Sequence, residues 1–376
     1  MAAHIDGFEY KPDCRYYSGY RPCRFKRLCS GCPHYSPASP RILLINLDAM
    51  GDVLMTTAML KPLKRKYGDT AHITWVTRSN AAPLLEHNPL VDRVMEYSPE
   101  NCMILADMAF DAVYNCDKSL NACALLDSVD TDARYGFGLS PWGTIVPVNS
   151  ENAYNFQMGL DDELKFRKNR QKGTRILHEG MGLEFRRDEY ILEQTDEEKA
   201  FIREYVMDND LEEKPVIGIN TGCSELLPNK KLSTDRYIEL CGLLGKAFPE
   251  AAVVLVGGKA ETERNSVISE KTEGVIHTPT TLGLRRGIGF IDACDVLITG
   301  DTLAMHIAIA LKKYTVAFFG LSCAQEIDLY GRGVKIVSDL ECSPCWKREC
   351  DDPKCITEID LNEIVAAAGT YISGTV

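Results

Sequence analysis

Short apolar runs alternate with amphipathic stretches along most of the chain beyond residue 40. Such runs are typical of strands covered on both faces, and apolar residues at helical spacing predict the helices between them. We predict strands at 41–47, 72–77, 91–96, 110–115, 215–220, 251–256, 295–299 and 315–319, helices at 53–67, 80–87, 234–248 and 303–311, and a charged helix and linker at 195–214. This alternation indicates right-handed β-α-β units. It predicts an α/β protein with two doubly wound, Rossmann-like domains that face a central cleft.

The pattern divides the chain into three parts. Residues 1–38 are rich in proline, glycine and cysteine and predict an irregular segment. We place one Rossmann-like domain at 39–210 and a second at 211–376, the latter with a Cys-rich loop at 342–355. Because open α/β sheets bind ligands at the carboxyl ends of their strands, we expect the functional site between the two domains.

Composition narrows the classes of function. The 376 residues include 42 basic and 54 acidic side chains, for a net charge of −12. This balance argues against broad binding to nucleic acid or to an anionic bilayer. No run approaches 18 apolar residues, and the first residues lack the pattern of a signal peptide. The 15 cysteines, an odd number, indicate a reducing compartment, so we expect a cytoplasmic protein.

Two loops that follow apolar strands carry candidate chemistry. Asp52 lies in the loop after the first strand, where it either caps the next helix or acts as a general base facing the cleft. In the loop 299–306, Asp301 and Thr302 precede a helix whose N-terminus attracts anions. They either cap that helix or orient a ribose, a sugar or a phosphate. His306 is more typical of a hydrogen-bonded structural histidine.

Two basic segments suggest anionic ligands. Residues 221–231 place Thr221, a glycine and two lysines, one of them Lys230, at the end of a strand. This composition suits a diphosphate, and a solvated loop is the alternative. Residues 163–175 form either a solvated helix face or a docking patch for a phosphorylated acceptor or an anionic membrane surface. The cations of that segment are Lys165, Arg167, Lys168, Arg170, Lys172 and Arg175.

Eight cysteines form two groups of four. The first group is Cys14, Cys23, Cys29 and Cys32, and the second is Cys342, Cys345, Cys350 and Cys355. Each group contains a Cys-x2-Cys pair and has enough thiols for one zinc ion or one iron–sulfur cluster. The spacings match no standard zinc finger, so reduced thiols or a disulfide are the alternatives. Because four thiolates leave no open coordination position, a bound metal would have a structural role.

Four stretches resemble the ADP-heptose:lipopolysaccharide heptosyltransferases, inverting enzymes of the GT-B fold in glycosyltransferase family nine. They are RILLINLDAMGDVLMTTAMLKPLKRKYGDTAHITWVT, NPLVDRV, VVLVGGKAE and DVLITGDTLAMHIAIALKKYTVAFFG, and the tail ECSPCWKRECDDPKCI is also similar to this family. The resemblance spans about residues 41–360. One departure is that Leu303 and Ala304 stand where the family usually has Gly-Pro.

The resemblance implies roles for individual residues. Asp52 matches the catalytic aspartate that deprotonates the acceptor hydroxyl. The residues that match the donor-binding positions are Thr221, Lys230, Gly257, Gly258, Gly300, Asp301, Thr302 and His306. We place the acceptor-binding positions at Lys165, Arg167, Lys168 and Arg170.

The implied reaction is transfer of a heptose, with inversion, from ADP-heptose to a lipopolysaccharide core or other saccharide, in the cytoplasm or at the periphery of the inner membrane. No DxD-type pair stands at the expected donor site, and the cationic loop can replace a divalent metal, so we expect metal-independent catalysis. From the net negative charge we expect no nucleic-acid partner. Two alternatives are a GT-B transferase or epimerase that uses another nucleotide sugar, and a metal or redox protein on a GT-B scaffold.

Overall fold

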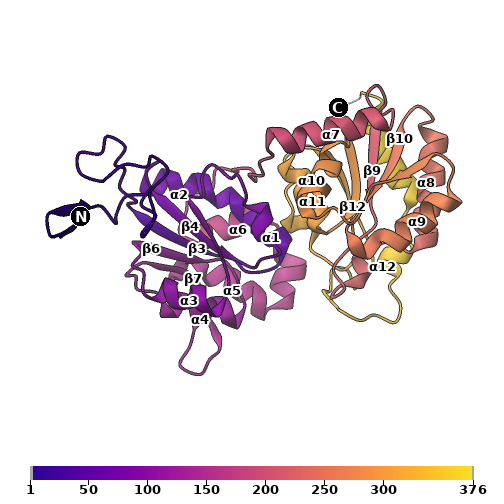
Figure 1. Ribbon diagram of the computed structural model, residues 1–376. Coiled ribbons are helices and arrows are strands. Elements are labelled where there is room, and N and C mark those ends of the chain that lie inside the picture. The colour runs from indigo at the N-terminus through magenta and orange to yellow at the C-terminus, as the bar shows by residue number, and fades with distance from the viewer. Residues whose placement is uncertain (1–2, 375–376) are drawn as a thin grey trace.

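The first of the two sheets lies in the N-terminal half of the chain. The computed structural model describes residues 3–374 and contains two six-stranded sheets flanked by helices (Figure 1). The first sheet has the order β5-β4-β3-β6-β7-β8 and is parallel except for the β7–β8 pair. Its strands are β3 (Arg41–Ile45), β4 (His72–Thr77), β5 (Arg93–Glu96), β6 (Ala112–Asn115), β7 (Arg134–Leu139) and β8 (Ile145–Pro147).

The second sheet is parallel throughout, with the order β11-β10-β9-β12-β13-β14. Its strands are β9 (Val216–Asn220), β10 (Ala252–Val256), β11 (Val275–His277), β12 (Val296–Gly300), β13 (Tyr314–Phe319) and β14 (Gly333–Val337). Strand order reverses between β3 and β6 in the first sheet and between β9 and β12 in the second. Doubly wound sheets bind their ligands at such switch points. The predicted fold, with two doubly wound domains, is confirmed.

Helices connect the strands in both lobes. Those of the first lobe are α1 (Met50–Thr56), α2 (Leu60–Tyr67), α3 (Pro99–Ala106), α4 (Leu120–Ser128), α5 (Ala153–Leu160) and α6 (Gly173–Gly180). They are followed by α7 (Asp196–Asp208), α8 (Thr234–Ala247), α9 (Thr262–Lys271), α10 (Leu284–Asp292), α11 (Leu303–Ala310), α12 (Lys354–Thr357) and α13 (Leu361–Ile372).

Two helix predictions need correction. The helix predicted at 53–67 begins earlier, at Met50, and a 3₁₀ turn at Thr57–Met59 divides it into α1 and α2. At this division the Thr57 hydroxyl donates to the carbonyl of Leu54 at 2.6 Å and so competes with the helical pattern. The helix predicted at 80–87 is wrong, because only a 3₁₀ turn at Ala82–Leu84 forms there, around a proline.

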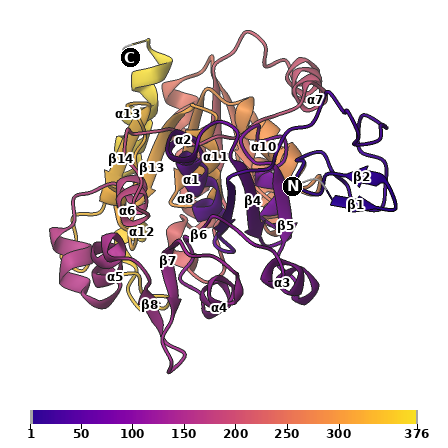
Figure 2. The same ribbon diagram turned by 90° about the vertical axis from the view of Figure 1, so that its left-hand side faces the viewer.

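The two lobes share a continuous hydrophobic core. Helices α1 and α11 pack against each other, so that Leu54 of the first lobe and Met305 of the second belong to one buried cluster (Figure 2). Helix α7, which the predicted boundary at 210 assigns to the first domain, packs against α10. There Phe201 meets Phe290 with ring centroids 5.9 Å apart. The boundary itself stays a prediction.

The N-terminal segment is irregular, as predicted, apart from a two-stranded ribbon of β1 (Ala3–Ile5) and β2 (Phe8–Tyr10). It lies at the outer end of the first lobe, on the side away from the second (Figure 1). Arg15 joins it to the lobe by donating to the carbonyl of Thr70 at 2.5 Å and by pairing with Asp92 at 3.4 Å. No helix between residues 3 and 374 is long and apolar enough to cross a membrane.

Candidate active site between the two lobes

Asp52 lies in the first turn of α1, where the chain leaves β3 at the switch point of the first sheet. It is not the N-cap, a position held by Ala49, but its carboxylate accepts the N–H of Ala49 at 3.4 Å. Its side chain is exposed to solvent, but the surrounding protein atoms reduce its hydration. This loss of hydration raises the pKa of Asp52, Asp301 raises it further, and His306 and Lys118 oppose the shift. Asp52 is therefore a more basic carboxylate than an ordinary aspartate.

His306 approaches Asp52 from the second lobe. Its ring lies where a side chain on Gly51 would stand, so glycine at that position lets α1 and α11 pack closely. The ring stacks on Tyr190 with centroids 6.0 Å apart, and its buried Nδ1 has no hydrogen-bond partner among the described residues. Burial lowers the pKa of His306, so the imidazole is neutral near pH 7. The unpartnered nitrogen is a candidate contact for a ligand.

Lys230 and Asp301 form an ion pair at the switch point of the second sheet. The Lys230 Nζ lies 2.7 Å from the Asp301 carboxylate, and both side chains are largely buried. Burial alone would raise the pKa of Asp301, but Lys230 and His306 outweigh it and lower the pKa below its usual range. Asp301 is therefore ionised at neutral pH. The pair brings together two residues that the sequence placed in separate loops.

Other predicted donor residues are held by neighbouring protein groups. The buried Thr221 hydroxyl donates to Asn265 at 2.6 Å, so it points into the second lobe. The Thr302 hydroxyl accepts from the side chain of Asn220 at 3.1 Å. Gly300 leaves room for the backbone carbonyl of Lys230, which a side chain would displace. Gly300 and Thr302 flank Asp301 in the chain, and contact of these three residues with a donor stays a prediction.

Glu261 is a residue that sequence analysis did not single out. Its buried carboxylate accepts the N–H of Gly258 at 2.9 Å and packs where side chains on Gly222 and Gly257 would stand. It thus joins the loops after β9 and β10 at the carboxyl edge of the sheet. The signal was available, because Glu261 closes the motif VVLVGGKAE.

Lys118 is a second such residue. It follows β6, on the other side of the first switch point from Asp52, and donates to Asn155 at 2.9 Å. Protein surroundings lower its pKa, and its positive charge opposes the raised pKa of Asp52. The signal for Lys118 was its position in the loop that follows a buried strand.

The basic segment 163–175 meets the second lobe. Arg167 donates to the carbonyls of Ser343 and Glu341 in the Cys-rich loop at 2.7 and 2.6 Å. The Lys165 Nζ lies 5.1 Å from the centre of the Trp346 ring. Lys168 is exposed and 4.0 Å from Glu163, and Arg170 donates to the neighbouring carbonyl of Asn169. Binding of an acceptor by these four residues stays a prediction.

Trp346 connects the Cys-rich loop to the ion pair. The Lys230 Nζ lies 4.3 Å from the centre of its ring, and its Nε1 donates to the Cys323 sulfur at 3.4 Å. Its backbone has a φ of +53°, a conformation that a bulky residue rarely adopts. The loop therefore holds the tryptophan over the lysine at a cost in backbone strain.

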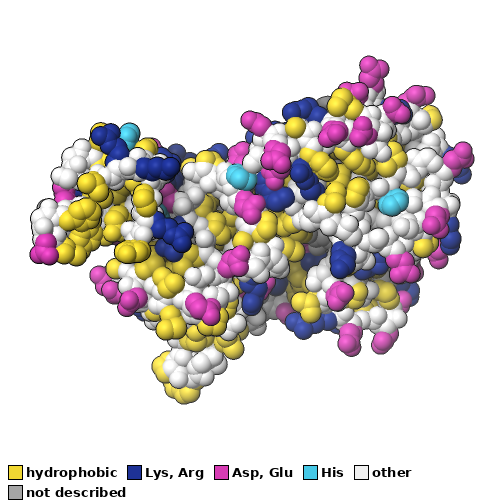
Figure 3. Space-filling model, viewed as in Figure 1, with side chains coloured by type: hydrophobic (Ala, Val, Ile, Leu, Met, Phe, Trp, Pro, Cys, Tyr) yellow, Lys and Arg dark blue, Asp and Glu magenta, His cyan; other side chains and the backbone are white. Residues whose placement is uncertain are grey.

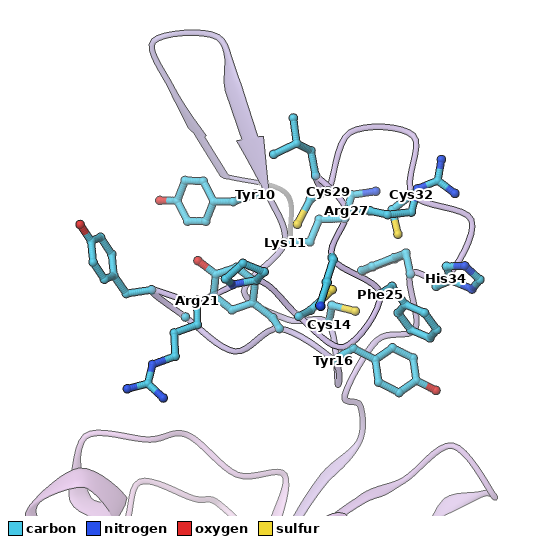
Figure 4. Close-up of a pocket in the computed structure, with 18 of the residues that line it drawn as sticks. Tyr10, Lys11, Cys14, Tyr16, Arg21, Phe25, Arg27, Cys29, Cys32 and His34 are labelled. Carbon is cyan, nitrogen blue, oxygen red and sulfur yellow. The ribbon is translucent and has the colours of Figure 1, made fainter.

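The two cysteine groups lie far apart: the first is in the N-terminal segment at the outer end of the first lobe, and the second is in the loop that contacts Arg167 where the lobes meet. In the N-terminal segment all four thiols line one cavity of about 410 Å³, together with His34 (Figure 4). In the C-terminal group, the other three thiols are close enough to Cys355 to raise its pKa, after burial. Within residues 3–374, no three cysteine, histidine or carboxylate side chains converge so as to hold a metal ion. The described thiols are free.

Comparisons with known proteins agree with the fold. The model of the family described as glycosyltransferase family 9 (heptosyltransferase) matches residues 104–356. Lipopolysaccharide heptosyltransferase 1 of Campylobacter coli is 23% identical over 297 residues, which cover 74% of this chain and 84% of the relative.

Two solved structures are similar over most of the chain. A family 9 glycosyl transferase from Veillonella parvula matches with a TM-score of 0.70 and 20% identity over 89% of this chain and 97% of its own. ADP-heptose lps heptosyltransferase II of E. coli matches with a TM-score of 0.65 and 20% identity, over 89% of this chain and 99% of its own. At these identities the likeness shows the fold.

Proposed function

The chain belongs to glycosyltransferase family 9, the heptosyltransferases, and from this premise we propose that it transfers a heptose from ADP-heptose to a saccharide of the lipopolysaccharide core. The observation that carries the proposal is the meeting of Asp52, from the first lobe, with His306, Asp301 and Lys230 of the second. In this proposal Asp52 is the proton acceptor and Lys230 is the cation that neutralises the diphosphate. We propose the first lobe, 39–210, as the acceptor domain and 211–376 as the donor domain.

The proposed reaction is a single displacement with inversion. Asp52 takes the proton of the acceptor hydroxyl while that oxygen forms a bond to the anomeric carbon. The bond between this carbon and the diphosphate oxygen breaks, and ADP leaves with the electron pair. In this scheme Lys230, which pairs with Asp301 just before α11, and the N-terminus of α11 stabilise the charge that builds on the diphosphate. No divalent metal is required in this scheme.

Substitution of Asp52 tests the proposed base. We expect Asp52→Asn to lower kcat by about 10²–10⁴-fold, the usual contribution of a general base, and to leave the Kd for ADP unchanged. The matched control is Asp48→Asn in the same loop, where an exposed carboxylate pairs with Arg78; we expect that variant to stay active, since exposed pairs contribute little. Full activity of Asp52→Asn would refute the base assignment.

Nucleotide binding tests the proposed donor. We would titrate the protein with ADP, UDP and GDP and follow its thermal stability, since a ligand at 100 times its Kd stabilises by about 2.7 kcal/mol. Selective stabilisation by ADP is the expected result. Preference for UDP or GDP would replace the donor while leaving the transferase chemistry in place.

We further propose a structural zinc ion or iron–sulfur cluster at the cysteine groups. The support is that four thiols line one cavity in the N-terminal segment and that Cys355 lies near the other three thiols of the C-terminal group. Because the described thiols do not converge as they stand, the metal would draw these turns together. Elemental analysis of the purified protein and of the Cys29→Ser and Cys355→Ser variants tests this, and a metal content unaffected by both variants would reject it.

A further inference from the structure

The N-terminal segment exposes an unusual share of large hydrophobic side chains. It forms about a tenth of the chain, yet it carries six of the sixteen large hydrophobic residues that are exposed between residues 3 and 374. Tyr20 is fully accessible, and Leu28 and Ile5 are 68% and 61% exposed. The other three are Phe8, Tyr17 and Tyr35. Apolar side chains that gather on one exposed surface mark an interaction site.

The same segment concentrates positive charge. Between Tyr20 and Leu28 the sequence YRPCRFKRL contains four cations and no acid, in a chain whose net charge is −12. The described residues provide no ion-pair partner for any of the four, and Arg24 instead lies over the ring of Tyr16 at 4.0 Å. The four cations are Arg21, Arg24, Lys26 and Arg27. Cations interleaved with aromatic and aliphatic side chains are typical of surfaces that bind at the boundary of headgroups and acyl chains.

The surroundings of the segment leave this surface open. No residue before Ile42 belongs to the buried hydrophobic clusters of the described chain, and the segment projects from the outer end of the first lobe. Apolar and basic side chains are visible together at that end (Figure 3). In contrast, the basic segment 163–175, the other candidate for membrane contact, uses Lys165, Arg167 and Lys172 to contact the second lobe.

We propose that residues 5–35 dock the first lobe onto a bilayer that contains anionic lipids. The exposed rings and Leu28 enter the interface, and the cations between Tyr20 and Leu28 contact the headgroup phosphates. Arg15 fixes this segment to the lobe that carries Asp52. The inference rests on the proposed function only in that a lipid-linked acceptor would then be presented to the lobe that holds the base.

Vesicle sedimentation tests the docking. The full-length protein is mixed with vesicles of equal parts phosphatidylglycerol and phosphatidylethanolamine, and with vesicles of phosphatidylcholine alone. We expect binding to the anionic vesicles, weaker binding to the neutral ones, and release as salt is raised, since salt screens charges at an exposed surface. Failure to sediment with the anionic vesicles would overturn the proposal.

Matched variants locate the surface. Reversing three cations, in Arg21→Glu, Lys26→Glu and Arg27→Glu combined, should weaken binding by at least about a hundredfold, given the contribution of each cation near an anionic membrane. The double variant Tyr20→Ser, Leu28→Ser should also weaken binding to the anionic vesicles, because it removes two apolar side chains that would enter the interface. The control reverses three exposed cations elsewhere, Arg203, Lys246 and Lys271, and should keep binding. Undiminished binding of the first triple variant, or loss in the control, would overturn the assignment.

A soluble acceptor separates this inference from the proposed function. Transfer to a deacylated, water-soluble core saccharide needs no membrane, so the triple variant should keep wild-type turnover on it. If the wild-type protein transfers no heptose but sediments as expected, the proposed function fails and the docking stands. If transfer occurs without sedimentation, the docking fails alone. If the wild-type protein binds the soluble saccharide in preference to vesicles, and the triple variant loses that binding, residues 5–35 bind saccharide and the proposal of bilayer docking is rejected.

Discussion

Two aspartates lie at the switch points of the two sheets, and their environments set them apart. Asp52 follows β3 and Asp301 follows β12, and each stands at the start of a helix, the two helices packing against each other. Loss of hydration acts on both and would raise both pKa values. The pKa of Asp52 is indeed raised, whereas that of Asp301 is lowered. The same fold element thus yields two carboxylates of opposite acid–base character.

The difference comes from one lysine. Lys230 lies 2.7 Å from Asp301, whereas no ion pair involves Asp52 in the described part of the chain. A poorly hydrated carboxylate with a cation beside it stays ionised, while one without such a cation gains proton affinity. Environments that separate the pKa values of neighbouring groups indicate which of them exchanges protons. The comparison favours Asp52 as the proton acceptor and Asp301 as a fixed charge that positions Lys230.

Removal of Lys230 should abolish the difference between the environments of Asp52 and Asp301, and it should have the largest effect on transfer. In Lys230→Met the diphosphate loses its cation and meets an unpaired Asp301, so we expect kcat/KM for ADP-heptose to fall by about 10²–10³-fold, as for loss of one charge-stabilising donor. The control is Lys231→Met, which removes the same charge one residue away. Steady-state kinetics measure both variants. Equal losses of kcat/KM in the two would show that Lys230 contributes no more to catalysis than Lys231 does.

The pH dependence of transfer should show which of the two aspartates, Asp52 or Asp301, exchanges protons. Because the base must be ionised, kcat/KM should fall as pH drops through the raised pKa of Asp52, while Asp301, whose pKa is lowered, stays ionised. Lys118 favours the ionised form, so in Lys118→Met the acidic limb should move to higher pH. The exposed Lys61→Met is the control and should leave the limb in place. If the acidic limb of the pH profile does not move in Lys118→Met, its assignment to Asp52 is contradicted.

Sequence alone predicted the parts of the site that follow directly from strand ends. Asp52 and Asp301 are candidates because each comes after an apolar run inside a stretch that resembles the family, and Lys230 is one because of its position in the loop 221–231. The two-lobed fold followed from the same alternation. Local spacing, however, could not tell which way a side chain points. The Thr221 hydroxyl was placed at the right edge, yet it turns toward Asn265.

Contacts between segments that are far apart in the chain could not be predicted from the sequence. Nothing in the basic run 163–175 indicates that Arg167 meets carbonyls more than 170 residues away, because such a contact depends on how the lobes pack. The same holds for Trp346, which was read only as part of a Cys-rich loop. Glu261 and Lys118 are a different case, since both lie in the short loops that follow strands, and a systematic search of those loops would have identified them.

Substitution of Trp346 should have the smallest effect on the difference between Asp52 and Asp301, because Trp346 contacts Lys230 and acts on Asp301 only through that lysine. Its ring lies 4.3 Å from the Lys230 Nζ, and a contact of this kind contributes about 0.5–2 kcal/mol. We therefore expect Trp346→Ala to raise the Kd for ADP by about two- to thirtyfold, and Trp346→Phe, which keeps an aromatic face but loses the N–H to Cys323, to raise it less. Calorimetric titration with ADP measures both. A purely structural role would lower the stability of both variants without this graded loss of affinity, and equal affinities across the series would separate the Cys-rich loop from the donor site.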